Sequence, residues 1–353
     1  MPNDRRSLFL WDLNDNGRIL IVMSRSIFVL LGVLAVSSAQ DGTATAERVL
    51  LGSGEHRYEW EQAWPASPND QLLGATHGGI VFGDDGHTLV ATESKRGILV
   101  FDADGQLIRN FGEAFARGNH GMHLVEQDGQ EFLVLAHIRL RRVIAITLEG
   151  EPLWNLEAPD AGDMYDEERV FRPTSVAYAP DGRLYVADGY GQSFVHIYDR
   201  ERNYLRSIGG FGTAPGQFNV PHGLIIDTRG DEPRLLVADR GNGRIQSFTL
   251  DGELLGQLDV KLRRPCSIAE RDGDLVIADL DGRVTILDEQ DQLVTHLGDN
   301  EDVAQRGKFI IERKTWKNGA FLSPHHAAWN DAGDLFVLDW NKFGRVTKLK
   351  RLK

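Results

Sequence analysis

The sequence predicts an all-β protein, a six-bladed β-propeller whose ring is closed by an N-terminal strand. Three observations favour this fold: six units repeat along the chain, each unit consists of short strands separated by turn residues, and one more strand-like segment precedes the first unit. A small sheet of this kind cannot bury both of its faces alone. Radial stacking of six such sheets into a closed ring buries them and leaves only short, protected edges.

The repeated units recur at irregular intervals of about 40–60 residues. They occupy residues 76–105, 119–150, 172–199, 220–252, 264–290 and 323–350. Each has an alternating first strand, a Gly or Asp-Gly turn, a Val-rich second strand and a third strand. The last unit shows only three strands, so we expect "HRYEWEQAWP" at residues 56–65 to supply its missing outer strand. The longest interruption, 294–318, is typical of a functional or mobile loop that covers one face.

Composition limits the function classes. The chain has 353 residues, of which 41% are hydrophobic, so it is long and apolar enough for a large globular core. A formal net charge of −13 argues against nucleic acid and anionic membranes as partners. The single cysteine, Cys266, excludes an intramolecular disulfide, and its apolar strand pattern predicts a buried small hydrophobe.

The N-terminal residues predict export. Met23 begins the charged segment "MSRS", which is followed by the apolar run "IFVLLGVLAV" and by small residues, the pattern of a secretory signal peptide. We therefore expect residues 1–22 to be a non-native extension, 23–39 a signal peptide and 40–353 a single propeller domain. The expected location is secreted or periplasmic, without stable membrane insertion after cleavage. An N-terminal anchor helix is the alternative, although the apolar run is short for a bilayer span.

Three histidines point to a metal site. His120, His222 and His325 open the first strand of units two, four and six, at separations of 102 and 103 residues. On a six-fold ring they stand roughly 120° apart around the axis, because the first strand of each blade lines the central channel. Thr174 and Cys266 hold the same position in units three and five. Three imidazoles with an open fourth position are the ligand set of a catalytic zinc site.

Four other histidines lie near the same rim. His77 opens unit one and is expected either to support the ligands from behind or only to pack, and His326 should point away from the target of its neighbour His325 because side chains alternate along a strand. His123 and His137 also cluster in unit two.

The loops after the second strands carry two further candidates. Asp188, Asp239, Asp279 and Asp339 end this strand in four units, and their repetition predicts bonding to local backbone amides rather than catalysis. Tyr190 and Arg240 follow two of them and should project towards the histidines. A tyrosine beside zinc can act as a general base, and an arginine can bind a carboxylate through two hydrogen bonds. Exposed loop positions without a catalytic role are the alternative for both.

The segment 216–248 resembles, nearly residue by residue, peptidylamidoglycolate lyase, the lyase half of the peptidylglycine α-amidating enzyme, within the larger group of NHL-repeat propellers. Residues 172–193 and 323–340 are similar to it as well, and the resemblance extends over roughly 118–349. The combination of the three rim histidines with "DGY" and "DRGNGRI" is far more specific than the repeats themselves.

This resemblance implies that His120, His222 and His325 bind zinc, that Tyr190 is the catalytic base and that Arg240 helps to hold the substrate. The implied reaction cleaves a peptidyl-α-hydroxyglycine into a peptide amide and glyoxylate, so the expected substrate has a terminal carboxylate. A separate monooxygenase partner would have to supply the α-hydroxyglycine substrate, since no copper monooxygenase half is present in the sequence.

The sequence departs from the family at two points of the site. A first-blade arginine of the family has no clean match, and Arg96 or Lys95 is the candidate replacement. The family's structural calcium uses an aspartate directly after the third zinc histidine, where this chain has His326, which argues against calcium.

Other functions remain open from the sequence alone. A non-catalytic NHL propeller that binds a protein or peptide would use the histidines for packing only. A related lyase or hydrolase could act on another small carbinol or amide with the same zinc. A lactonase-like hydrolase would need calcium bound by oxygen ligands, yet no acidic residue holds a strand-opening position.

Overall fold

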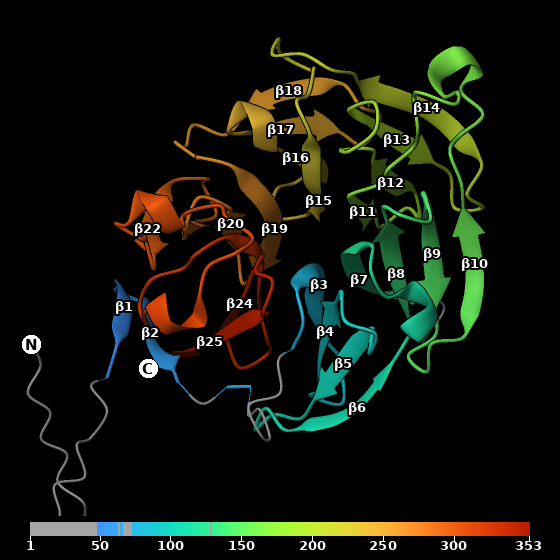
Figure 1. Cartoon of the computed structure of the whole chain (residues 1–353). Coiled ribbons are helices and arrows are strands. Elements are labelled where there is room, and N and C mark those ends of the chain that lie inside the picture. The colour runs from blue at the N-terminus through green and yellow to red at the C-terminus, as the bar shows by residue number, and fades with distance from the viewer. Residues whose placement is uncertain (1–47, 63, 66–72, 128) are drawn as a thin grey trace, which may run out of the picture. The chain divides into compact units, whose positions relative to one another are not determined.

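Six antiparallel sheets surround a central axis in the computed structural model, which describes residues 48–62, 64–65, 73–127 and 129–353 (Figure 1). Five of these sheets have four strands and the sixth has five. The predicted six-bladed β-propeller is therefore confirmed. The expected extension at 1–22 and the expected signal peptide at 23–39 lie outside the described residues. Among the residues described, no helix is long and apolar enough to cross a bilayer.

The first three blades follow the chain order of the first three sequence units. Blade one comprises β3 (Thr76–Phe82), β4 (Thr88–Thr92), β5 (Ile98–Phe101) and β6 (Leu107–Phe111). Blade two comprises β7 (Asn119–Gln127), β8 (Gln130–His137), β9 (Arg142–Ile146) and β10 (Pro152–Leu156). Blade three comprises β11 (Ser175–Tyr178), β12 (Leu184–Ala187), β13 (Phe194–Tyr198) and β14 (Tyr204–Gly209).

The remaining blades repeat this arrangement. Blade four comprises β15 (Pro221–Asp227), β16 (Arg234–Asp239), β17 (Arg244–Thr249) and β18 (Leu254–Gln257). Blade five comprises β19 (Pro265–Arg271), β20 (Asp274–Asp279), β21 (Arg283–Leu287) and β22 (Leu293–Leu297). Blade six comprises β23 (Pro324–Trp329), β24 (Leu335–Asp339) and β25 (Arg345–Arg351), joined by β2 (His56–Glu61) and β1 (Leu50–Ser53).

Helical structure among the described residues is confined to short 3₁₀ turns in the connections. They are η2 (Glu113–Phe115), η3 (Gly162–Met164), η4 (Arg240–Asn242), η5 (Val303–Gln305) and η6 (Arg313–Thr315).

The innermost strands form a closed ring. These strands, each of which contacts the innermost strand of both neighbouring blades, are β3, β7, β11, β15, β19 and β23. Their first residues therefore meet at one end of the central channel, as the repeat pattern predicts.

The core lies between the blades. Six clusters of buried apolar side chains are present, one at each boundary between neighbouring blades. At the boundary between blades three and four, for example, Tyr185 and Val195 pack with Leu224 and Val237. Each sheet thus buries both faces only because it has two neighbours, which is why a single unit would be unstable alone.

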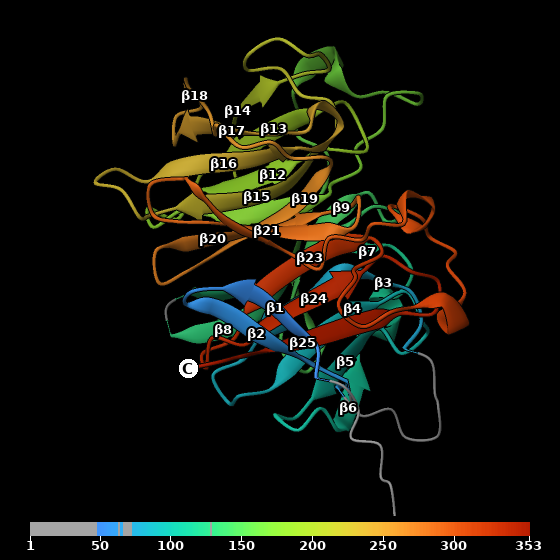
Figure 2. The same ribbon diagram turned by 90° about the vertical axis from the view of Figure 1, so that its left-hand side faces the viewer.

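N-terminal strands close the ring, as predicted. β2 pairs antiparallel with β25, and Trp60 lies opposite Leu349 (Figure 2). β1 then pairs with β2 as a fifth strand, which the sequence did not predict. β2 also contributes to the core between blades five and six, because Tyr58 and Trp60 are both buried there.

Trp60→Ala should lower the free energy of unfolding by about 3–5 kcal/mol, the usual cost of deleting a buried aromatic side chain. The indole is only 5% exposed, and its ring lies 5.1 Å from the ring of Phe321. Leu50→Ala on β1 is the matched control, because Leu50 is 48% exposed and should change stability by no more than about 0.5 kcal/mol. Urea unfolding measures both, and a loss below about 1 kcal/mol in Trp60→Ala would contradict this account of closure.

Candidate metal centre

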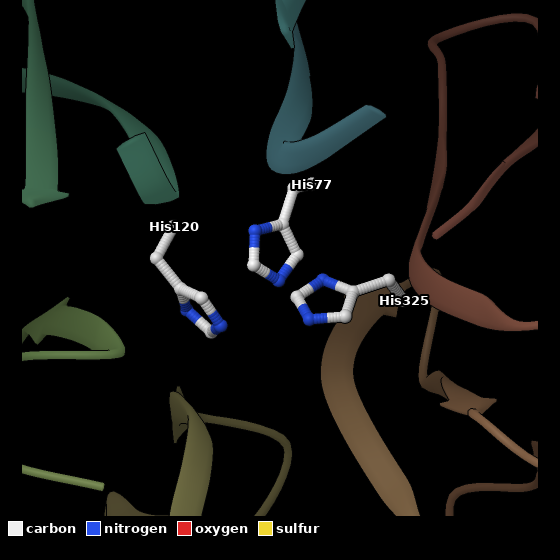
Figure 3. Close-up of side chains that lie close together, drawn as sticks. All are labelled: His77, His120 and His325. Atoms are coloured by element: carbon white, nitrogen blue, oxygen red, sulfur yellow. The ribbon is translucent and has the colours of Figure 1, made fainter. Parts of the chain in front are cut away.

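Four imidazoles meet at one end of the central channel. His77, His120, His222 and His325 are each the second residue of an innermost strand, and each is at most 7% exposed. Successive ring centroids around this group lie 4.5, 4.6, 4.7 and 4.5 Å apart. The structure therefore brings together the three predicted histidines and adds His77 to them. Figure 3 shows three of these rings converging from separate strands.

Hydrogen bonds between blades orient two of the rings. His120 Nδ1 donates to the carbonyl of Thr174 at 2.9 Å, and His222 Nδ1 donates to the carbonyl of Cys266 at 2.8 Å. A carbonyl only accepts, so each bond places the ring proton on Nδ1 and leaves the lone pair on Nε2. Thr174 and Cys266 occupy the position in blades three and five that the histidines occupy in blades two and four. The alternation seen in the sequence thus pairs each of these imidazoles with a backbone carbonyl of the next blade.

The inward-facing nitrogens fit a metal ion. His325 Nε2 is buried and has no hydrogen-bond partner among the described residues, an arrangement that a metal–nitrogen bond would satisfy. The ligand atoms of His77, His120 and His325 all lie within 4.8 Å of one another. A second group of the same kind joins His325 to His222 and Cys266. Nitrogen donors with a neighbouring thiol suit zinc and related transition metals rather than calcium or magnesium.

Burial keeps the imidazoles in the form that binds metals. Loss of solvation lowers the pKa of His120, His222 and His325 well below the ordinary value of 6.5. The neighbouring positive charge of Arg240 acts in the same direction on all three. These rings are therefore neutral at pH 7, and only a neutral imidazole has a lone pair for a metal.

Tyr190 and Arg240 adjoin the imidazoles, as predicted. Tyr190 Oη lies 3.2 Å from His120 Nε2 and 3.5 Å from His222 Nε2. Arg240, the first residue of η4, donates from Nη1 to the same oxygen at 3.0 Å. Burial raises the pKa of the Tyr190 phenol above 10, and the Arg240 guanidinium opposes that shift. The phenol oxygen is thus the meeting point of two imidazoles and one cation.

The four strand-ending aspartates bond local backbone amides, as expected. Each accepts from the segment that leads into the innermost strand of its own blade. The acceptor and donor pairs are Asp188 with Arg172, Asp239 with Asn219, Asp279 with Arg263 and Arg264, and Asp339 with Leu322 and Ser323. They hold the turns from which the rim residues project.

Blade three differs from the next three blades at this aspartate. In blades four to six, the first residue of the third strand is an arginine that pairs with the aspartate, namely Arg244, Arg283 and Arg345. Phe194 begins the third strand of blade three, and Tyr165 Oη donates to Asp188 Oδ2 at 2.8 Å instead. The Tyr165 oxygen also lies 2.6 Å from His196 Nε2. Burial raises the pKa of Asp188 to about 6, and the hydrogen bonds from the backbone amides of Arg172 and Gln192 oppose that shift.

The sequence missed the partner of His77. Glu93, directly after β4, lies with its Oε1 3.1 Å from His77 Nδ1. Trp340 stacks against the His77 ring at a centroid distance of 5.9 Å, and Phe309 from the long loop before blade six packs on Trp340. The only signal in the sequence was that His77 opens its unit at the same position as the predicted ligands. The His77 ring contacts both His120 and His325, so it lies in the same layer as two of the three predicted ligands.

The other rim candidates have different surroundings. Arg96 donates from Nη2 to the carbonyl of Leu73 at 3.3 Å, and Lys95 is exposed. His137 Nδ1 accepts from the backbone of Leu140 at 3.1 Å, so its ring supports a turn at the end of β8. Cys266 is buried, and burial raises the pKa of its thiol to about 11, in agreement with the predicted small hydrophobe.

A second layer of the channel contains His123 and His326. His326 lines the same cavity as His123, Ser175 and Ser267, next to the imidazoles of His120, His222 and His325. His123 Nε2 lies 3.1 Å from Ser175 Oγ. Burial lowers the pKa of His123 to about 4 and that of His326 to about 3, so both rings are neutral at pH 7. Neutral imidazoles and hydroxyls are not the carboxylate-rich donors that calcium prefers.

Known proteins similar to this chain include lyases and monooxygenases of peptide amidation. A peptidyl-glycine alpha-amidating monooxygenase B of Xenopus laevis is 32% identical over 170 residues, which are 46% of this chain and 19% of that protein. A probable peptidyl-alpha-hydroxyglycine alpha-amidating lyase of Caenorhabditis elegans is 31% identical over 179 residues, 49% of this chain and 47% of that protein. NHL repeat-containing protein 3 of Homo sapiens is 38% identical over 87 residues, 24% of each chain. These similarities confirm the resemblance identified from the sequence.

The matched region spans about half or less of each of these relatives. No family model matches the chain. Among solved structures, virginiamycin B lyase from Staphylococcus aureus has a TM-score of 0.52 at 13% identity and covers 80% of this chain and 99% of its own. A gluconolactonase from Xanthomonas campestris has a TM-score of 0.55 at 16% identity and covers 80% of this chain and 87% of its own. At these identities the structures support the propeller fold alone.

The free energy of unfolding should fall as the pH decreases from 7 to 5. Burial lowers the pKa of His196 to about 3, so between pH 6.5 and about 3 the unfolded chain binds more protons there than the folded chain. His123, with a pKa lowered to about 4, acts in the same sense. Asp188 acts in the opposite sense, because a raised pKa favours the folded state as the pH falls, and so do Glu131, Asp274 and Asp339. Among the described residues, these four carboxyls are outnumbered by the eight imidazoles whose pKa is lowered.

His196→Gln should reduce the loss of unfolding free energy between pH 7 and pH 5 by about 1–2 kcal/mol. Glutamine does not titrate, and each pKa unit is worth about 1.4 kcal/mol. Urea unfolding at pH 7 and pH 5 measures the difference. His87→Gln is the control, since His87 lies on the surface, paired with Asp85. If the free energy of unfolding falls equally between pH 7 and pH 5 in His196→Gln and in the parent, His196 is not a source of the pH dependence.

Proposed function

We propose that the protein is a zinc-dependent lyase that cleaves a peptidyl-α-hydroxyglycine, or a similar carbinolamide, into an amide and glyoxylate. The observation that carries the proposal is the position of Tyr190 Oη, within 3.5 Å of two imidazole Nε2 atoms and 3.0 Å from an arginine Nη1. The similarity to amidating lyases of other organisms supports a lyase-like enzyme.

His120, His222 and His325 would hold the zinc ion. Two of them have Nδ1 anchored to a backbone carbonyl, and the third has a buried Nε2 without a partner among the described residues. A zinc ion bound there would supply Lewis acidity, polarising the substrate hydroxyl and lowering its pKa. Burial of the surrounding rings excludes water, which strengthens the interactions that position the substrate.

The ionised form of the Tyr190 phenol would accept the proton of the substrate hydroxyl at Oη. As that proton leaves, the carbinol oxygen forms the aldehyde carbonyl of glyoxylate and the C–N bond breaks, so the electron pair passes to the amide nitrogen. The nitrogen then takes up that proton from Tyr190 Oη and leaves as the primary amide, which returns Tyr190 to its ionised form. Arg240 favours the ionised phenol by its charge and by the hydrogen bond from Nη1.

Arg240 would also bind the carboxylate of the substrate. Its guanidinium lies beside Tyr190, with its carbon 5.2 Å from the centre of the phenol ring. A guanidinium has five N–H donors, so Nη1 can bond Tyr190 while other donors remain for a carboxylate. One side chain would then align the substrate and favour the ionised phenol.

The proposed reaction places the protein after a hydroxylation step. A separate monooxygenase would supply the α-hydroxyglycine, since this reaction only cleaves the carbinolamide. Export to a periplasm or to the outside of the cell belongs to the same proposal and rests on the "IFVLLGVLAV" run after Met23.

Tyr190→Phe should lower kcat by about 10²–10⁴-fold, the usual contribution of a general base, while zinc content stays equal to that of the parent. The assay incubates the purified, zinc-loaded protein with an α-hydroxyglycine-extended peptide and measures glyoxylate. Tyr204→Phe is the matched control, because Tyr204 Oη bonds Ser207 on an outer strand. If the zinc-loaded parent releases no glyoxylate, the substrate assignment is wrong. If the parent binds no zinc and His222→Ala is equally stable, the result favours a non-catalytic scaffold.

Arg240→Met should lower kcat/KM by about 10–100-fold for a substrate with a free carboxylate, because one charge-assisted hydrogen bond contributes about 1.5–3 kcal/mol. The loss should be smaller for the corresponding carboxamide substrate. Arg109→Met on β6 is the control, since Arg109 is exposed on an outer strand. Equal losses of kcat/KM for both substrates would show that Arg240 acts only through Tyr190 and does not bind the substrate carboxylate.

A further inference from the structure

We propose that His77 is a fourth imidazole ligand of the metal centre and that Glu93 is the residue that orients it. This inference rests on the metal-binding part of the proposed function and extends the ligand set from three histidines to four. It makes blade one, for which the sequence offered only Arg96 or Lys95 as site candidates, a part of the coordination shell.

The position of His77 is equivalent to that of the other three. It is the second residue of β3, as His120 is of β7 and His325 is of β23. Its ring centroid lies 4.5 Å from the centroids of both neighbouring imidazoles, no farther than the predicted ligands lie from one another. Its ligand atom and those of His120 and His325 form a group within 4.8 Å.

The hydrogen bond to Glu93 prepares the ring for a metal. His77 Nδ1 lies 3.1 Å from Glu93 Oε1, and a carboxylate accepts the ring proton at that nitrogen. Nε2 is then left as the lone-pair nitrogen, as in His120 and His222. Metal-binding histidines commonly donate their second nitrogen to a carboxylate or a carbonyl, which fixes the ring and raises its basicity. The backbone supports the carboxylate, because Glu93 N donates to the carbonyl of Ala75 at 2.8 Å.

Packing holds the same ring from the other side. Trp340 stacks on it with an interplanar angle of 28°, and Phe309 lies 5.2 Å from Trp340. A ring fixed by a carboxylate and an aromatic face loses little freedom on binding an ion. Zinc accepts four nitrogen ligands and can expand to five, so a four-imidazole site still admits a substrate oxygen.

The test compares zinc affinity and the cobalt spectrum of matched variants. The full chain is stripped with a chelator and titrated with zinc in competition with a chromophoric chelator, and cobalt(II) replaces zinc for absorption spectra. His77→Ala should weaken zinc binding at least tenfold and change the cobalt absorption bands, and Glu93→Gln should weaken binding by about 10–100-fold. His87→Ala should match the parent, because this half-buried histidine of the same blade lies away from the imidazole cluster and pairs with Asp85.

Urea unfolding of each stripped variant separates loss of a ligand from loss of the fold. If His77→Ala has the zinc affinity and cobalt bands of the parent, the four-imidazole site is wrong. The proposed function with three histidine ligands then still stands, provided that His222→Ala loses zinc. A parent that binds no zinc overturns the proposed function together with this inference.

Discussion

Closure of the ring of innermost strands is the constraint on which the site depends. His77 and His325 lie about 250 residues apart in the chain, yet their rings are 4.5 Å apart because β3 and β23 are neighbours in the closed ring. The pairing of β2 with β25 completes blade six, and Trp60 fills the core between blades five and six. A propeller opened at this seam would keep most local strand pairing but would lose the convergence of the rim residues.

Closure also determines how each imidazole is presented. The hydrogen bonds from His120 to Thr174 and from His222 to Cys266 cross blade boundaries, so they form only when neighbouring blades have their native packing. They orient Nε2 towards the axis before any ion arrives. Burial keeps the rings neutral, and a protein with a net charge of −13 thereby holds an uncharged nitrogen cluster at its centre. A divalent cation bound there would meet little competing positive charge apart from Arg240.

The sequence predicted the fold and most of the cluster for one physical reason: both follow from local periodicity. Strand-and-turn alternation identified six units, and register within the units placed His120, His222, His325, Tyr190 and Arg240 at one rim. The residues that sequence reasoning missed depend on contacts between segments whose geometry no repeat specifies. Glu93 follows a strand in "ATES", without the aspartate of later units, and Tyr165 reaches blade three from an irregular connection. β1 went unrecognised because its residues are mostly exposed and lack an alternating pattern.

The departures from the repeat pattern concentrate where chemistry is proposed. Blades four to six pair the strand-ending aspartate with an arginine, whereas blade three, which carries Tyr190, pairs Asp188 with Tyr165 and through it with His196. An arginine at position 194, paired with Asp188, would place a second cation near the Tyr190 phenol and near three neutral imidazoles. Tyr165 instead satisfies the carboxylate without charge, and Asp188 still accepts the backbone amides of Arg172 and Gln192 that fix the Tyr190 loop. The loop is therefore held as firmly as its counterparts, while Arg240 stays the cation that bonds the Tyr190 oxygen.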